Sequence, residues 1–157
     1  MMGVGKSTVA RVLSVRLNRA VWDSDQVIEE RSGRSVRRIF ADDGEPAFRA
    51  LETAVLLDAL ASTTPLVIAT GGGVVLAEAN RDALRDAGAR VVWLCADPAT
   101  LVDRVKAGGH RPLLDQDPAG TLQRMLIERE ALYREVADAI VLVDNRSVSE
   151  VVEAVLR

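Results

Sequence analysis

Apolar residues recur along this chain in two patterns, one with a helical period and one in short continuous runs. The spacing of Val9, Val12, Leu13 and Leu17 is typical of an amphipathic helix. The predicted helical segments are 6–18, 26–62 with breaks near 32–33 and 43–44, about 77–87, 98 to about 106, 119–137 and 148–157. Short apolar runs predict the strands 20–23, 66–69, 90–95 and 139–143. Strands that alternate with helices indicate an α/β fold, in which a parallel sheet is sandwiched between helices.

Polar or glycine-rich segments follow three of the predicted strands, at residues 23–25, 71–73 and 144–146. In open parallel sheets, ligands bind beyond the carboxyl ends of the strands. We therefore expect these segments to converge at one edge of the sheet. Gly5-Lys6-Ser7 would join them if a strand preceded Met1.

Length and charge exclude several classes of protein. A chain of 157 residues suits a single domain, and its net charge of −3 gives no basic field for nucleic acid. We see neither an apolar run of membrane-spanning length nor the apolar core of a signal peptide. These features predict a cytoplasmic protein that binds neither nucleic acid nor a membrane.

The first residues match the second half of a phosphate-binding loop. The full pattern is Gly, four residues, Gly, Lys, then Ser or Thr, and its first Gly would fall just before Met1. Gly3 and Gly5 would let the backbone approach phosphate oxygens. Lys6 would reach the β- and γ-phosphates, and the hydroxyl of Ser7 would bind Mg²⁺. A chance Gly-Lys-Ser at a helix start is the alternative, which the amphipathic helix that follows disfavours.

Asp23 and Asp25 form a second candidate site. At positions i and i+2 of a strand end, their side chains are expected to point the same way. One would hold Mg²⁺ through water, and the other would accept a hydrogen bond or a proton from a substrate hydroxyl. The alternative is ordinary turn chemistry, with Asp25 as the N-cap of the next helix.

Arg49 and Glu52 lie three residues apart on a predicted helix, within reach of each other. They form either a surface ion pair or a substrate-facing arginine that Glu52 holds in place and that binds a carboxylate with two parallel hydrogen bonds. Gly71-Gly72-Gly73 is either a flexible turn or a point where the backbone approaches a ligand closely.

Residues 107–118 are rich in Gly, Pro, Arg and Asp and are expected to form a mobile lid. Arg111 lies in it, and closure would bring this side chain to the phosphates and exclude water. For Arg104, Arg111 and Arg134 taken singly, a solvent-exposed position is the simpler interpretation.

Together these segments resemble the shikimate kinase family. They occur in the family's order and cover nearly the whole chain. The matching segments are Gly3–Thr8, Asp23–Asp25 with Ile28-Glu29, Ile39-Phe40 through Gly44-Glu45, Phe48-Arg49, Glu52, Gly71–Gly73, Arg111–Leu114, Leu132–Arg134 with Ala137-Asp138, and Asn145-Arg146.

The resemblance implies a small P-loop kinase, active as a monomer, that transfers the γ-phosphoryl group of ATP to the 3-hydroxyl of shikimate with the help of Mg²⁺, in chorismate biosynthesis. It implies a substrate-binding region at about 24–62. It assigns catalysis to Asp25, Lys6 and Arg111, with Asp25 as the candidate base. The implied ATP-binding residues are Gly3, Val4, Gly5, Lys6, Ser7, Thr8, Arg104, Arg111 and Arg146.

For the metal, the resemblance implies Ser7 and Asp23. For shikimate it implies four residues, of which Arg49 and Arg134 grip the carboxylate; the set is Asp25, Arg49, Gly72 and Arg134. The family often has a proline shortly after the residue that matches Arg146. Here Ser147-Val148-Ser149 stands instead, which weakens the expected adenine contacts at this loop.

Two alternatives remain at this point. A related small-molecule kinase, such as gluconate kinase, would share the phosphate loop and the lid. A truncated, inactive module that binds nucleotide or shikimate is the other. In the family the strand before the phosphate loop lies in the middle of the sheet, and losing its apolar side chains would cost on the order of 10 kcal/mol. We therefore expect a true start upstream of Met1, and weak ATP affinity and poor stability for the chain as given.

Overall fold

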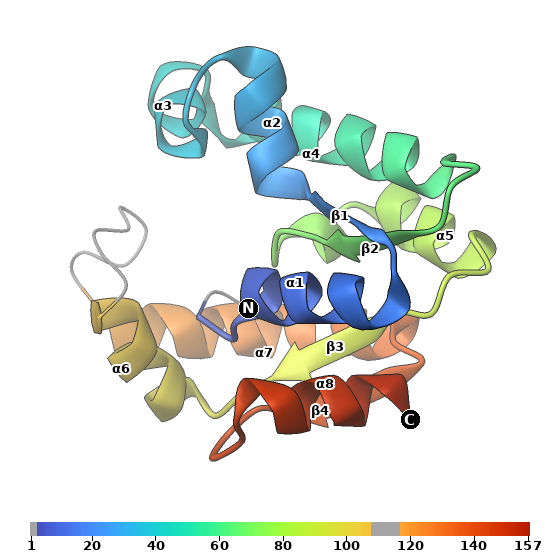
Figure 1. The fold of residues 1–157 in the computed structure, drawn as a ribbon. Helices are drawn as coiled ribbons and strands as arrows, with labels where there is room; N and C mark the ends of the chain where they lie inside the picture. The colour runs from blue at the N-terminus through green and yellow to red at the C-terminus, as the bar shows by residue number, and fades with distance from the viewer. Residues whose placement is uncertain (1–2, 108–116) are drawn as a thin grey trace. The chain divides into compact units, whose positions relative to one another are not determined.

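The computed structural model describes the backbone of residues 3–107 and 117–157, and the side chains of residues 3–102 and 117–157. These residues form two compact units (Figure 1). One comprises the N-terminal loop as far as Val9 together with Arg90–Arg157, and the other comprises Ala10–Ala89. The division falls within helix α1 (Lys6–Leu17), so each unit is described by itself.

The unit of residues 10–89 is built on two parallel strands, β1 (Ala20–Asp23) and β2 (Leu66–Ala69). Their register pairs Ala20 with Leu66 and Asp23 with Ala69, so both strands end at the same level. The connection between them contains three helices. These are α2 (Ser24–Ser32), α3 (Val36–Asp42) and α4 (Gly44–Leu60).

A hydrophobic cluster holds these helices together. Its buried members come from all three helices and are Ile28, Ile39, Phe48 and Val55. Trp22 of β1 packs against the cluster and so links it to the strand pair. Burying one such side chain stabilises a fold by roughly 1.5–3 kcal/mol. Tertiary packing therefore stabilises α3, which is too short to be stable alone.

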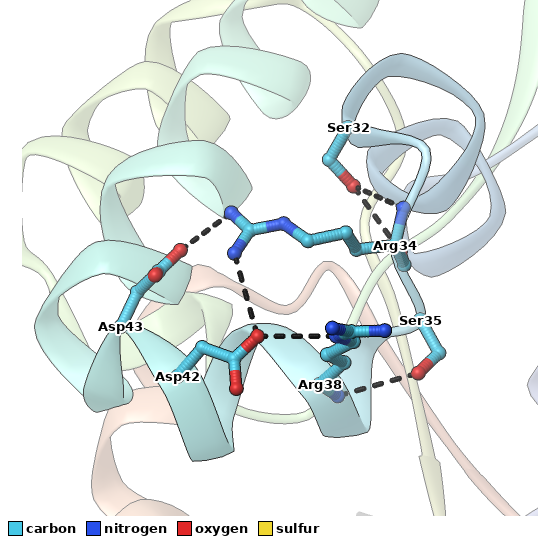
Figure 2. A network of polar contacts seen from close by, with 6 residues as sticks. All are labelled: Ser32, Arg34, Ser35, Arg38, Asp42 and Asp43. Carbon is cyan, nitrogen blue, oxygen red and sulfur yellow. Dashed lines mark hydrogen bonds and ion pairs between the residues drawn. The ribbon is translucent and has the colours of Figure 1, made fainter.

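Charged side chains join the two ends of α3 (Figure 2). The guanidinium of Arg34, just before α3, donates to Asp43 at 2.5 Å and lies 3.8 Å from Asp42. Arg38 donates to the same Asp42 carboxylate at 3.2 Å. The Ser35 hydroxyl caps α3 by accepting from the backbone N–H of Arg38. The turns before and after this helix are thus bound to each other.

After β2, the chain forms a short 3-10 helix, η1 (Val74–Leu76), and then α5 (Glu78–Asp86). Gly88 follows α5 with φ of 60°, a left-handed conformation that glycine adopts without strain. The predicted helix at 77–87 is confirmed, and Gly88 follows its C-terminus as the pattern predicted. The pattern did not predict η1, because a three-residue turn shows no period.

The other unit contains a second parallel pair, β3 (Val92–Cys95) and β4 (Ala139–Leu142). Helices α6 (Pro98–Ala107) and α7 (Pro118–Val136) pack on each other, and α8 (Val148–Leu156) packs on β4 (Figure 1). Trp93 of β3 stacks on Tyr133 of α7 with ring centroids 5.1 Å apart. Ser147 and Glu150 form a capping box that starts α8.

These elements confirm the predicted α/β class and its parallel strands. Within the described parts of the chain, the four strands form two separate two-stranded ladders. The predicted lid at 107–118 lies outside the described residues, apart from its ends. Among the described residues, no helix is both long and apolar enough to span a membrane.

Candidate active site

The predicted phosphate loop contains two glycines in left-handed backbone conformations. Gly3 and Gly5 have φ values of 78° and 88°, which residues with a β-carbon rarely adopt. The side chain of Val4 between them is buried and anchors the loop. Helix α1 begins at Lys6, directly after Gly5, so this loop lies at the positive end of a helix. Such an end attracts phosphate.

The acidic pair differs from the prediction. Asp23 ends β1, but α2 already begins at Ser24, so Asp25 lies in the first helical turn and the two do not share a strand. Asp23, not Asp25, is the N-cap: its Oδ1 accepts from the backbone N–H of Asp25 at 3.2 Å and of Gln26 at 3.5 Å. The expectation that both residues lie on a strand end was therefore wrong, and so was the alternative of a cap at Asp25. The cap at Asp23 places Asp25 at a helix N-terminus.

Ser24, between the two aspartates, links α2 to the glycine triplet. It is buried, and its hydroxyl accepts from the backbone N–H of Gly71 at 3.0 Å. The sequence analysis missed this residue, because a single serine after a strand carries no specific signal. Its hydrogen bond fixes the start of the 71–73 turn against the start of α2.

Arg49 is held on two sides by carboxylates of its own helix. Its Nη1 donates to Glu52 at 2.7 Å, and its Nε and Nη2 donate to one oxygen of Glu45 at 3.1 and 2.8 Å. Glu52 is only 1% exposed, so the predicted pair with Arg49 is not the surface ion pair of the simpler interpretation. Burial disfavours the charged guanidinium, but Glu52 and Glu45 outweigh it and raise the pKa of Arg49 above its usual value.

The same side chains explain two glycines of the triplet, Gly71 and Gly73. A β-carbon on Gly73 would collide with the guanidinium of Arg49, and one on Gly71 would collide with the Glu52 carboxylate and lie 3.6 Å from Oδ1 of Asp25. Gly73 has φ of −93°, so steric space and not backbone conformation requires glycine there. The turn therefore brings Asp25, Arg49 and Glu52 together around residues 71–73.

Helix α5 holds the segment that follows the triplet. Asn80 is buried and donates from Nδ2 to the carbonyl of Val74 at 3.0 Å. Arg81 donates to the carbonyls of Val75 at 2.8 Å and Leu76 at 3.3 Å. The analysis of the sequence missed both residues. A signal existed for Asn80, since it lies four residues before the buried Leu84 and so occupies a core position.

An open pocket of about 460 Å³ adjoins this arrangement. Its walls come from α4, the triplet, η1 and α5, and its lining residues are Glu45, Pro46, Arg49, Gly73, Leu76, Ala77 and Asn80. The Arg49 side chain thus borders space that a small anionic ligand can enter.

The remaining predicted arginines belong to the other unit. Arg134 of α7 donates from Nε and Nη2 to Glu130 at 3.0 and 2.8 Å and lies over the Trp93 ring. Arg146 is exposed in the turn after β4. Arg104 belongs to the part of α6 in which only the backbone is described, and Arg111 lies outside the described residues.

Comparison with known proteins identifies the family. The family model described as shikimate kinase matches residues 2–157. The chain belongs to the shikimate kinase family. A shikimate kinase of Symbiobacterium thermophilum is 43% identical over 99% of this chain and 90% of its own. One from Pseudomonas paraeruginosa is 44% identical, again over 99% of this chain and 90% of its own.

Solved structures agree with this membership of the shikimate kinase family. A shikimate kinase from Acinetobacter baumannii, determined in complex with shikimate, matches 99% of this chain and 86% of its own with a TM-score of 0.92 and 36% identity. A gluconokinase from Sinorhizobium meliloti matches 99% of this chain and 85% of its own, with a TM-score of only 0.56 and 19% identity. The gluconokinase likeness concerns the fold alone, so the comparisons favour the first of the two predicted kinases.

Proposed function

We propose that this protein transfers the γ-phosphoryl group of ATP to the 3-hydroxyl of shikimate. The observation that carries the proposal is the similarity to shikimate kinases over 99% of the chain at 43–44% identity. The arrangement of Asp25, Arg49 and Glu52 around the glycine triplet supports it. Glu52 is paired with Arg49, so the group offers the Arg49 cation and the Asp25 carboxylate to an acceptor that has a carboxylate and hydroxyl groups.

On the acceptor side, Arg49 would bind the shikimate carboxylate, and Arg134 would be a second carboxylate ligand. The backbone of Gly72 would contact the ring. Asp25 would accept a hydrogen bond from the reacting hydroxyl and take its proton during transfer. It lies in the first turn of α2, where the positive end of the helix dipole favours a negatively charged side chain.

On the nucleotide side, the loop of residues 3–8 would cradle the phosphates, with Lys6 on the γ-phosphate and Arg111, Arg104 and Arg146 as further ATP contacts. The new bond joins shikimate O3 to the γ-phosphorus while the bond from that phosphorus to the β,γ-bridging oxygen breaks and ADP leaves. Most of the catalytic effect would come from positioning and charge neutralisation.

The hydroxyl of Ser7 and the carboxylate of Asp23 would hold Mg²⁺. Both are oxygen donors, the kind that this ion prefers, and it commonly uses few protein ligands alongside substrate phosphates. Bound Mg²⁺ would neutralise charge that develops on the phosphates. We further propose that the protein acts as a monomer in the cytoplasm, where its co-substrate ATP is available.

The direct test is ADP release from ATP in the presence of shikimate, beside identical reactions with gluconate and without acceptor. We expect turnover with shikimate, a product heavier by one phosphoryl group, and background rates in the other two reactions. Turnover of gluconate but not shikimate would contradict the proposal. Shikimate binding without turnover would instead support the inactive module.

A further inference from the structure

The two arginines assigned to the shikimate carboxylate share one unusual detail. In each, Nε and Nη2 both donate to a single carboxylate oxygen of the glutamate four residues earlier on the same helix. Glu45 accepts from Arg49 at 3.1 and 2.8 Å, and Glu130 accepts from Arg134 at 3.0 and 2.8 Å. The arrangement is thus present in both units, on α4 and on α7.

In both arginines the glutamate occupies the edge of the guanidinium that carries Nε and Nη2. This matters because a guanidinium binds a carboxylate best through two parallel N–H groups on one side. In Arg49 the buried Glu52 already engages Nη1. Arg49 and Glu45 both line the open pocket, and Glu45 is the carboxylate in place on the Nε–Nη2 edge. An incoming carboxylate that needs this edge must first move the Glu45 side chain away.

Glu45 and Glu52 differ in how easily they can move. The Glu45 side chain is 53% exposed, whereas that of Glu52 is 1% exposed. Glu45 can therefore rotate into water and keep its charge hydrated, which a buried carboxylate cannot do without a large cost. Glu52 is suited to hold the arginine permanently, and Glu45 is suited to leave it.

We propose that Glu45 is an internal competitor that the substrate's carboxylate displaces from Arg49, and that Glu130 has the same role at Arg134. This inference rests on the proposed function and deepens it, because it names residues that set the affinity for the anionic acceptor. A neutral ligand lacks the charge to displace either glutamate, so the pair also selects for a carboxylate-bearing acceptor.

The expected effect is modest. Exposed pairs four residues apart on a helix are weak, so removing one competitor should strengthen binding by about two- to fivefold and not by orders of magnitude. The opposite sign is expected if Glu45 serves only to hold Arg49 in its binding position, because its loss would then weaken shikimate binding.

The test compares Glu45→Gln, Glu130→Gln and the double variant with the wild-type protein. The matched control is Glu78→Gln, which removes the same charge from an exposed position near the pocket on α5. The measurements are KM for shikimate, KM for ATP, kcat, and the Kd of shikimate by calorimetry without ATP. The methyl ester of shikimate, a neutral analogue, serves as a second ligand.

We expect each glutamate variant to lower the KM and Kd of shikimate about two- to fivefold, and the double variant to combine both effects. The KM of ATP and the affinity for the methyl ester should stay within error of wild type, as should all values for Glu78→Gln. An unchanged or higher Kd for shikimate in Glu45→Gln, at an unchanged melting temperature, would overturn the inference. So would an equal gain for the ester.

The wild-type measurements separate this inference from the proposed function. If the wild-type protein binds and phosphorylates shikimate but the glutamate variants bind it no better, only the competitor role of Glu45 and Glu130 is refuted. A wild-type protein that neither binds nor phosphorylates shikimate would refute the proposed function, and this inference with it.

Discussion

The guanidinium of Arg49 occupies the space that a β-carbon on Gly73 would need. A side chain from α4 and a backbone atom from the turn after β2 are thus in direct contact. The position of the arginine depends on the absence of a single methyl group.

Gly73→Ala should therefore displace Arg49 and raise the KM of shikimate about tenfold, since a charge-assisted hydrogen bond contributes roughly 1.5–3 kcal/mol. The KM of ATP should not change. The control is Gly33→Ala, where a β-carbon meets no atom within 4 Å but φ is 66°. That variant should lower the melting temperature without changing the KM of shikimate, and a similar rise in KM there would contradict the steric argument.

Arg49→Ala should raise the KM of shikimate roughly 10- to 100-fold while kcat falls much less, because it removes a contact to the carboxylate and not to the reacting group. The comparison variant is Arg49→Lys, which keeps the positive charge but cannot form two parallel hydrogen bonds to a carboxylate. It should bind shikimate more tightly than Arg49→Ala and more weakly than the wild type. An unchanged KM in Arg49→Ala would refute the carboxylate assignment.

Asp25→Asn should lower kcat roughly 100-fold or more with a small change in the KM of shikimate, since it removes a proton acceptor and keeps a hydrogen-bonding group of the same shape. Steady-state kinetics at saturating ATP measure both quantities. If kcat stayed within a factor of three, another group would have to accept the proton.

Asp23 has a structural role as the α2 N-cap and a proposed role at the metal, and two substitutions separate them. Asparagine caps a helix about as well as aspartate does, whereas alanine costs about 1 kcal/mol. Asp23→Asn should thus keep the melting temperature but raise the Mg²⁺ concentration needed for half-maximal activity. Asp23→Ala should change both. A normal Mg²⁺ requirement in Asp23→Asn would leave only the capping role.

The Arg34–Asp43 pair predicts a pH dependence of stability. The hydrogen bond from Arg34 lowers the pKa of Asp43, so the pair's contribution is fully present above the usual carboxyl pKa of about 4 and is lost as the pH falls through the lowered value. The difference in unfolding free energy between wild type and Asp43→Asn should accordingly be largest at pH 7 and shrink below about pH 4. Arg34→Gln should remove the same dependence; if that dependence persists, another partner is responsible.

Local patterns in the sequence predicted most elements of the fold. Helix α4 and the reach of Arg49 to Glu52 follow from spacing alone, and the ion pair is present at 2.7 Å. The placement of Asp25 on a strand end was wrong because β1 ends at Asp23 and α2 begins at the next residue. Sequence patterns do not locate the boundary between a strand and a helix to within one residue.

The reason for the glycine triplet is not local either. Its contacts come from Arg49 and Glu52 on a preceding helix, and its anchor comes from Ser24 at the start of another. Three glycines in a row were compatible with a flexible turn or with close approach to a ligand, and only the fold shows that protein side chains lie against Gly71 and Gly73. The role of Asn80 was accessible in principle, as a polar residue on the buried face of α5.

The turn from β1 into α2 gives each of three consecutive residues a separate task. Asp23 caps the helix, Ser24 holds the Gly71 backbone, and Asp25 faces the triplet. Inserting or deleting one residue here would shift all three side chains at once. Relatives that keep this chemistry should therefore vary in length elsewhere along the chain and keep this turn at constant length.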